Sequence, residues 1–355
     1  MKKSKLVCIV LVLALCFAFV GCGASAPAPT ENPAPAAPAA ADAAATAEKK
    51  TVNVMVLMPN AGDTYFQNKS YGYTLGEQSA NSEFPELDVV VKMYDAGGYE
   101  YAERQISQME DAITQGVDVI VLTPCDSEAL VPYVEKALAA GIVVVNDDIA
   151  VNCDCTSAIY ENSVRAGKFV GYRMAESMNY EGNVCLLKGP SSGSLFVNRG
   201  KGVVEGLSAF DNINILDEQF QTDDVMAGMS QVEDWIQRFG DDLDAIYIHG
   251  ATQAIVAADS LKAAGYNPGD VKIFTFDVST ESLQYLQDGW LTGIVPAQPI
   301  KVAQTAVIYG VRAYMGEEIP TKVFSNDDYP ILCDEAEFFD TGFCMAPDGW
   351  SPKLN

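Results

Sequence analysis

The chain of 355 residues carries 48 acidic against 22 basic residues, a formal net charge of −26. Nucleic acids and acidic membrane surfaces are poor partners for so anionic a protein, because like charges repel. The sequence also lacks a phosphate-binding loop, an HExxH or Cys-x-x-Cys motif and an EF-hand loop, and it contains one histidine, His249. We therefore expect no nucleic-acid partner, no metal and no cofactor.

The first 22 residues have the organisation of an export signal. Three lysines, Lys2, Lys3 and Lys5, precede an apolar run over residues 6–20, which is too short for a comfortable membrane span. The following Gly21 and Cys22 resemble the cleavage box of bacterial lipoproteins, in which the cysteine becomes lipidated. We expect a lipoprotein held outside the cytoplasmic membrane by Cys22, with a plain secretory signal as the alternative.

Residues 23–50 are rich in alanine and proline, and five prolines forbid a continuous helix: Pro27, Pro29, Pro33, Pro35 and Pro38. Such a composition is typical of a semi-rigid spacer. We interpret the segment as a tether between the anchor and a soluble body.

From residue 51 onward, apolar strand-like runs alternate with helical periodicity. Strands are expected at 52–57, 117–122, 142–145, 184–187, 245–248, 271–276 and 291–295, and helices at 64–81, 102–113, 130–138, 164–178, 203–210, 225–239, 255–261 and 300–314, with a short helix between the last two strands. This alternation predicts parallel sheets with right-handed crossovers, and the length favours two lobes. We expect an α/β protein with two Rossmann-like lobes, residues 51–160 with 299–328 and 161–298 with 329–355, so that the chain crosses between them three times.

The first strand is followed by a short polar loop and two aromatic residues. Ligands bind at the carboxyl ends of strands in open parallel sheets, which is where Asn60 and Asp63 lie. Asp63 can accept hydrogen bonds from hydroxyl groups, and Tyr65 and Phe66 offer flat faces to a ring. The alternative interpretation is a helix-capping aspartate with two aromatic side chains in the core.

Six cysteines remain once Cys8, Cys16 and Cys22 are assigned to the signal and the anchor: Cys125, Cys153, Cys155, Cys185, Cys333 and Cys344. An even number in an exported chain allows disulfides. Cys333 and Cys344 bracket a short C-terminal loop and are the favoured pair. Cys153 and Cys155 are too close in sequence for an ordinary disulfide with each other.

The order of these pieces resembles the type I substrate-binding proteins of sugar ABC transporters, which include the ribose- and galactose-binding proteins. The resemblance covers about residues 52–330. It implies the type I periplasmic-binding-protein fold, with parallel sheets flanked by helices, a ligand in the cleft between the lobes, and hinge bending on binding.

Several positions match that family residue by residue. Asp63, Tyr65 and Phe66 stand where the family has a polar residue and two aromatics around the sugar. Asp147 and Asp148 stand where an aspartate binds hydroxyls, with a register uncertain by one. The resemblance gives the same role to Asp277 and places Gln298 at a hinge crossing. Asn60 joins this ligand set.

Other positions depart from the family pattern. Ile149 replaces an arginine, residues 249–253 replace an Asn-Asp pair, and the family's ligand arginine falls on Val197, two places before Arg199. An aromatic wall is missing near residues 221–224, although Phe220 is close. Arg199 is therefore a candidate ligand residue, and the ligand need not be a simple pentose or hexose.

The sequence thus predicts a monomeric solute-binding lipoprotein that delivers a neutral sugar or sugar-like polyol to an ABC transporter permease, without catalysing a reaction. One alternative is a nucleoside or autoinducer-like ligand, taken up or sensed. An alternative of another class is a secreted glycosidase with an acid/base pair drawn from Asp63, Asp147, Asp148 and Asp277. The export signal and the missing basic headpiece exclude a DNA-binding regulator.

Overall fold

The computed structural model describes residues 48–221, 224–325, 331–332, 334–336 and 341–355. The export signal with Cys22, nearly all of the tether, and Cys333 lie outside these residues, so the predictions made for them stay predictions. No helix in the described part of the chain has the length and apolarity needed to cross a membrane.

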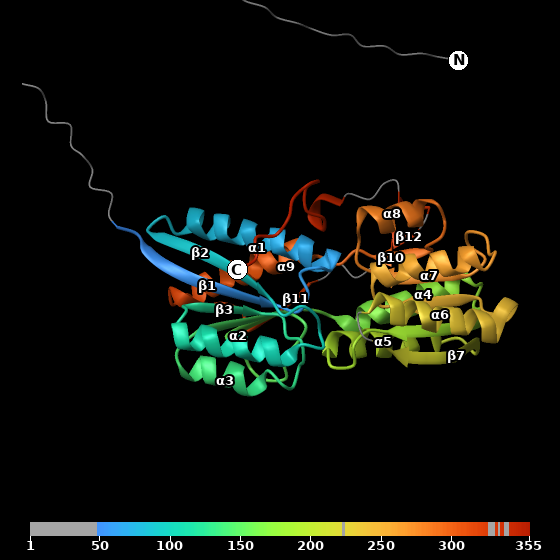
Figure 1. Cartoon of the computed structure of the whole chain (residues 1–355), viewed down its shortest axis with the longest axis horizontal. Coiled ribbons are helices and arrows are strands. Elements are labelled where there is room, and N and C mark those ends of the chain that lie inside the picture. Colours follow the sequence, from blue (N-terminus) through green and yellow to red (C-terminus); the bar gives the residue numbers. More distant parts are fainter. Residues whose placement is uncertain (1–47, 222–223, 326–330, 333, 337–340) are drawn as a thin grey trace, which may run out of the picture. The chain divides into compact units, whose positions relative to one another are not determined.

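The first lobe contains a six-stranded sheet in which every neighbouring pair is parallel. Its strands, in spatial order, are β11 (Lys322–Ser325), β5 (Ser157–Glu161), β4 (Val143–Asp148), β3 (Val119–Leu122), β1 (Lys50–Met58) and β2 (Leu87–Asp95). Helices α1 (Thr64–Glu83) and α9 (Pro299–Tyr314) pack together on one face of the sheet, and α2 (Ala102–Gln115) and α3 (Val131–Ala139) on the other (Figure 1).

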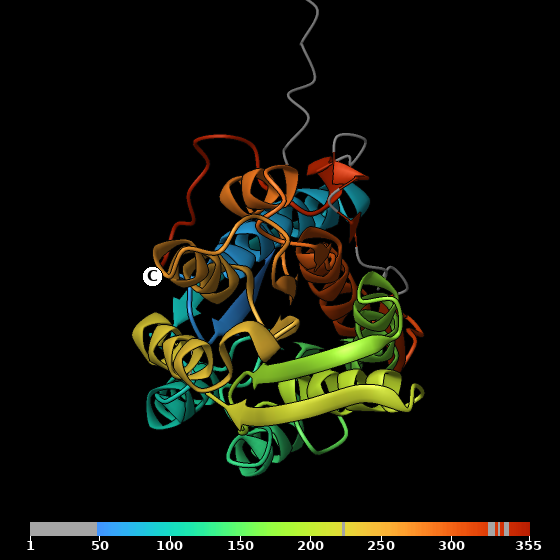
Figure 2. The same cartoon turned by 90° about the vertical axis from the view of Figure 1, so that its right-hand side faces the viewer.

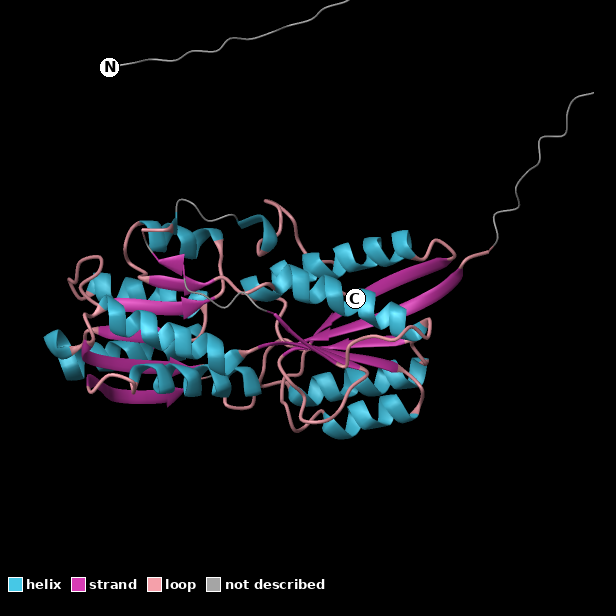
Figure 3. Cartoon of the chain, turned by 180° about the vertical axis from the view of Figure 1, so that it is seen from behind, coloured by secondary structure: helices cyan, strands magenta, loops and turns pink. Residues whose placement is uncertain are grey.

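The second lobe repeats this plan (Figures 2 and 3). Its strands, in spatial order, are β12 (Ile331–Leu332), β10 (Gly293–Val295), β9 (Lys272–Phe276), β8 (Ala245–Ile248), β6 (Glu181–Lys188) and β7 (Asn212–Phe220). Only the β10–β12 pair is antiparallel within this sheet. Helices α4 (Ser163–Ser177) and α5 (Ser194–Leu207) cover one face, and α6 (Val225–Phe239), α7 (Ala251–Ala263) and α8 (Thr280–Gln287) cover the other.

The central strands form because they are apolar enough to be buried on both faces. All four residues of β3 and all four of β8 are buried, as expected of parallel strands covered by helices. Helices α4 and α5 approach closely through glycine: a Cβ on Gly202 would lie 2.1 Å from the carbonyl oxygen of Val164. Gly202 therefore serves the packing of these two helices.

The predicted α/β fold with two parallel-sheet lobes is confirmed. Sequence periodicity missed β2, β5, β7, β11 and β12. Strand β7 contains no buried residue and is polar at the sheet edge, so it lacks the apolar signal used to find strands. The helix expected at 203–210 instead begins at Ser194 and ends at Leu207, and β4 continues to Asp148, beyond the strand end expected at residue 145.

Of the described residues, only 346–355 differ from the expected assignment of 329–355 to the second lobe, because β12 joins the second-lobe sheet and Cys344 packs in its core, as expected. The N–H of Ala346 donates to the side chain of Asn68 on α1, and the ring of Trp350 lies 5.4 Å from that of Tyr71. The N–H of Asn355 donates to the carbonyl oxygen of Met93 on β2. The tail thus returns to the first lobe, because its aromatic and backbone partners are there.

Candidate functional site

A cavity lies at the carboxyl ends of the strands and is lined by residues of both lobes. It encloses about 430 Å³ of space between protein atoms, part of which opens to solvent. Its lining residues are Asp63, Tyr65, Phe66, Tyr99, Asp148, Ile149, Leu195, Phe196, Arg199, His249, Gly250, Gln253 and Asp277.

The start of α1 forms one wall of the cavity. Asp63 is the N-cap residue, and its carboxylate accepts a hydrogen bond of 2.8 Å from the N–H of Tyr65. Phe66 is 2% exposed and belongs to the first-lobe core, while its ring also borders the cavity. The two sequence interpretations of this stretch are therefore compatible. Asp63 caps the helix and Phe66 packs in the core, and both residues also border the cavity.

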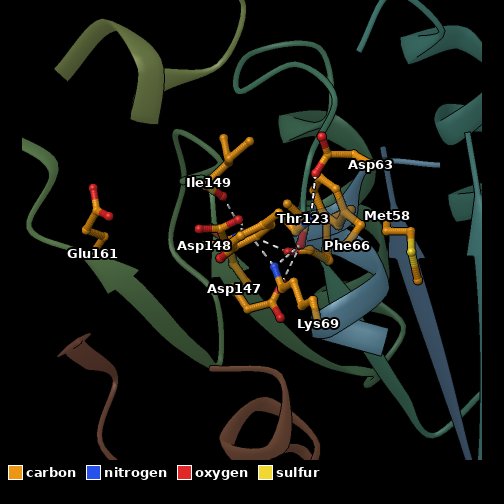
Figure 4. A network of polar contacts seen from close by, with 12 residues as sticks. Met58, Asp63, Phe66, Lys69, Thr123, Asp147, Asp148, Ile149 and Glu161 are labelled. Carbon is orange, nitrogen blue, oxygen red and sulfur yellow. Dashed lines mark hydrogen bonds and ion pairs between the residues drawn. The ribbon is translucent and has the colours of Figure 1, made fainter. Parts of the chain in front are cut away.

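The paired aspartates at the end of β4 have different environments (Figure 4). Asp147 is fully buried beneath the cavity, where its carboxylate accepts hydrogen bonds from the hydroxyls of Thr123 (2.6 Å) and Tyr73 (2.7 Å) and contacts the Lys69 ammonium at 3.2 Å. Asp148 borders the cavity, and its Oδ2 lies 3.5 Å from the same ammonium. Asp147 is thus held inside the protein by its partners, and Asp148 is the one of the two that borders the cavity.

Sequence reasoning missed Lys69, which has no exposed surface and stands between the two aspartates (Figure 4). A buried lysine is tolerated only when it is paired, and the two carboxylates supply that pairing. A signal for it was present: Lys69 follows Phe66 by three residues and precedes Tyr73 by four, which places it on the buried face of α1.

Asp277 follows β9 and occupies the corresponding position in the second lobe. Both Asp148 (φ 71°) and Asp277 (φ 72°) adopt the left-handed backbone region, a strained conformation that clusters at functional sites and that aspartate tolerates. The residue Asp277 is partly exposed, but its Oδ1 is buried and has no hydrogen-bond partner among the described protein groups. Burial raises the pKa of Asp277 well above its ordinary value, and Arg199 only partly opposes this shift.

Arg199 lines the cavity but is already paired. Its guanidinium makes two hydrogen bonds, of 2.8 and 2.7 Å, to the carboxylate of Glu161, and it lies 3.7 Å from the ring centroid of Phe276. Burial lowers the pKa of Arg199, but the Glu161 carboxylate outweighs burial and the pKa is raised overall. The arginine therefore stays charged, and Glu161 is a second residue that sequence reasoning did not find.

Besides Asp147, two more predicted ligand residues do not line the cavity. The Asn60 side chain accepts a hydrogen bond from the N–H of Gly62 within the loop. Gln298 is 5% exposed at the start of α9, next to Ala297, whose φ of 52° marks a strained backbone at the crossing between lobes. Gln298 is thus placed at the crossing predicted for it, without bordering the cavity.

Comparison with known proteins places this architecture in a family. The model of the periplasmic binding protein domain matches residues 37–318. The chain belongs to this family.

Curated relatives of this binding-protein chain are similar over part of their length. It is 28% identical over 190 residues to the xylitol-binding protein of Mycolicibacterium smegmatis, covering 53% of this chain and 54% of the relative. It is 26% identical over 206 residues to the ribose import binding protein of Bacillus subtilis, covering 58% of this chain and 66% of the relative. The chain thus spans between about half and two thirds of the length of these two relatives.

Solved structures support the fold of this family member. A Mycobacterium smegmatis protein in complex with β-D-fucofuranose has a TM-score of 0.71 and 24% identity, covering 81% of this chain and 93% of that protein. A solute-binding protein of an ABC transporter from Bacillus halodurans with bound myo-inositol has a TM-score of 0.73 and 21% identity. The match covers 82% of this chain and 98% of that protein.

The positions that depart from the family pattern lie partly inside the site of this binding protein. Ile149, His249, Gly250 and Gln253 line the cavity, so the altered loop does contribute to it. Val197 is 38% exposed and does not line it. Phe220 also lies outside the cavity lining, with the Lys188 ammonium 4.0 Å from its ring centroid.

The cysteines of the described residues are not among those that line the cavity. Cys125, Cys153, Cys155 and Cys185 form no disulfide within the described residues, and burial raises the pKa of Cys155 to about 12. The favoured Cys333–Cys344 pairing stays a prediction because Cys333 lies outside the described residues. A search of the described residues for groups of three or more metal-ligating side chains found none.

Proposed function

We propose that the protein is an extracytoplasmic solute-binding lipoprotein that captures a sugar or sugar-like polyol and delivers it to an ABC transporter permease. One observation carries this proposal: Asp148 and Asp277 end corresponding strands of the two lobes and border the same cavity. A carboxylate can accept charge-assisted hydrogen bonds from two hydroxyls of a polyol. The relatives named for xylitol and ribose support this ligand class.

The geometry favours binding by closure of the two lobes. Tyr65 and Phe66 offer ring faces from the first lobe, and Phe196 contributes one from the second. Ligand hydroxyls that bond to Asp148 and Asp277 together connect the lobes, so the binding energy stabilises the closed form. The closed form would present surfaces of both lobes to a permease.

A thermal-shift screen of the purified full-length chain against sugars, polyols and nucleosides tests the ligand class. A ligand at about 100 times its dissociation constant stabilises the folded protein by roughly 2.7 kcal/mol. The best sugar or polyol is then titrated calorimetrically into Asp148→Ala and Asp277→Ala, each expected to lose about 1.5–3 kcal/mol of binding free energy per lost bond. Asp288→Ala, at an exposed site distant from the cavity lining, is the matched control.

Unchanged affinity in both cavity variants would contradict the assigned site. A nucleoside as the best hit would favour the alternative ligand class, and release of a free sugar from a glycoside would favour the glycosidase.

The lipid anchor is tested separately from the ligand. Changing Cys22 to Ser should move the protein from the membrane fraction to the soluble fraction, because the expected acylation site is removed. If the variant binds membranes as firmly as the unmodified sequence does, Cys22 is not the anchor.

A further inference from the structure

The charges around the cavity are unbalanced. Asp63, Asp148 and Asp277 line it, and Glu161 and Asp147 lie directly behind the lining. Two cations accompany these five carboxylates: Arg199, which is paired with Glu161, and Lys69, which contacts Asp147 and Asp148. The cluster therefore has three more acidic than basic groups, and its cations are already engaged inside the protein.

The excess charge is placed where water screens it poorly. Asp148 is 9% exposed, and Oδ1 of Asp277 is buried without a partner among the described protein groups. A buried carboxylate without a compensating cation is unfavourable because it has lost hydration. Ligand hydroxyls would supply hydrogen bonds, but they would leave the net charge of the closed cavity unchanged.

The aromatic lining suits a cation as well as a sugar face. The rings of Phe66 and Phe196 each lie close to that of Tyr99, at centroid distances of 6.4 and 5.3 Å. The Lys69 ammonium already lies 5.4 Å from the Phe66 centroid, so this ring contacts a cation within the protein. Aromatic faces combined with carboxylates form a favourable environment for an ammonium group.

We propose that the ligand is a ring with a protonated amine, an amino sugar or an aminocyclitol, in place of the neutral ring expected from the sequence. The inference rests on the proposed function and narrows its substrate class. The amine forms an ion pair with Asp277 or with the neighbouring Asp63 and Asp148, and the hydroxyls of the ring use the remaining acceptors. A neutral sugar lacks this ion pair, and an anionic ligand meets like charge in the cavity.

Two matched sets of probes separate charge from shape: D-galactosamine, D-galactose and N-acetyl-D-galactosamine, and the three corresponding D-glucose compounds. Calorimetric titration of the full-length chain at pH 7 should show at least one amino sugar binding at least tenfold more tightly than its two neutral counterparts. Acetylation removes the charge at the same ring position, so the acetylated sugar controls for contacts made by the nitrogen.

Variants of the cavity aspartates test which carboxylate causes the preference for an amino sugar. Asp277→Asn preserves the side-chain size at a left-handed position that asparagine tolerates, so folding should persist. It should reduce the ratio of amino-sugar to neutral-sugar affinity at least fivefold, and Asp148→Asn provides an independent second variant. The ratio should not change in Asp288→Asn, which has an exposed carboxylate outside the cavity lining.

The outcomes distinguish this inference from the proposed function. A neutral sugar that binds as tightly as its amino counterpart would overturn the inference and leave the proposed function standing. An affinity ratio unchanged in both cavity variants would also overturn it. Absence of binding by all six probes would reject it as well, while the wider screen of sugars and polyols decides the proposed function.

Discussion

The two lobes use the same helix position for different purposes. Lys69 and Arg199 are each the sixth residue of the helix that follows the first strand of their lobe. Lys69 pairs with Asp147 and Asp148 within the first lobe, whereas Arg199 pairs with Glu161, at the end of β5 in the sheet of the other lobe. The buried Lys69 thus stabilises the interior of the first lobe. The buried Arg199 of the second lobe connects that lobe to the first.

Because of this difference, the two aspartates that border the cavity differ in the partners that their carboxylates have inside the protein. Asp148 has the Lys69 ammonium at 3.5 Å, whereas Oδ1 of Asp277 has no hydrogen-bond partner among the described protein groups. The comparison teaches that the first-lobe half of the site is largely compensated before a ligand arrives, and the second-lobe half is not. Four experiments test it.

Removal of the first-lobe cation should have the largest effect. Lys69→Met should lower the free energy of unfolding by about 3–5 kcal/mol, because it leaves two buried carboxylates uncompensated. Urea denaturation measures the loss, and Lys69→Met combined with Asp147→Asn should recover part of it. Lys136→Met removes a lysine that is 58% exposed and 3.9 Å from Glu110, and should change stability by less than about 1 kcal/mol. Equal effects of Lys69→Met and Lys136→Met would contradict the buried-cation assignment.

Removal of the second-lobe cation should cost less stability and affect binding more. Arg199→Met should lower the free energy of unfolding by roughly 1.5–3 kcal/mol, the scale of hydrogen bonds to a charged group, because Glu161 can gain water when the lobes separate. Denaturation and ligand titration together measure both effects. Arg312→Met, which breaks a similar pair with Glu83 at a side chain 37% exposed, is the control. A stability loss as large as that of Lys69→Met would show that the two cations act alike.

The incomplete compensation of Asp277 should appear in the pH dependence of stability. Burial raises its folded pKa above that of the unfolded chain, so the native state binds more protons between the two values. The free energy of unfolding should therefore fall, by up to about 1.4 kcal/mol per pH unit, as pH rises from about 4 through the raised pKa. The groups acting on Asp277 are Arg199, Asp63, Asp148 and Glu161. Asp277→Asn should remove this decline in urea denaturation measured from pH 4 to 7, and parallel curves for both proteins would argue against it.

Contacts between the lobes outside the cavity lining should give the smallest effect. The Ser127 hydroxyl accepts a hydrogen bond of 3.1 Å from the N–H of Ser194, and its own N–H donates to the carbonyl oxygen of Ser192. Ser127→Ala removes only the hydroxyl and should weaken ligand binding by about 1 kcal/mol, mainly through faster dissociation. Stopped-flow measurement tests this, with the exposed Ser107→Ala as control. An unchanged dissociation rate would exclude a role for this contact in closure.

The sequence could place the acidic residues of the site because strand ends follow from local patterns. Asp277 comes directly after an apolar run and Asp63 follows one across a four-residue loop, and in parallel sheets such positions meet at one edge. It could not distinguish Asp147 from Asp148, because neighbouring residues of a strand point to opposite faces and the register was uncertain by one. The fold was predictable to a similar degree: central strands have an apolar signal, and the polar edge strand β7 has none.

The sequence by itself therefore determined the α/β alternation, the two lobes and the strand ends at which the cavity forms, since each depends on short-range periodicity. Only the tertiary structure decided that Lys69 is buried, that Arg199 pairs with Glu161, and that the C-terminal residues return to the first lobe. Those outcomes depend on charged and backbone polar groups that are distant in sequence and pair with one another. The local sequence pattern around a buried charge does not indicate which distant residue it pairs with.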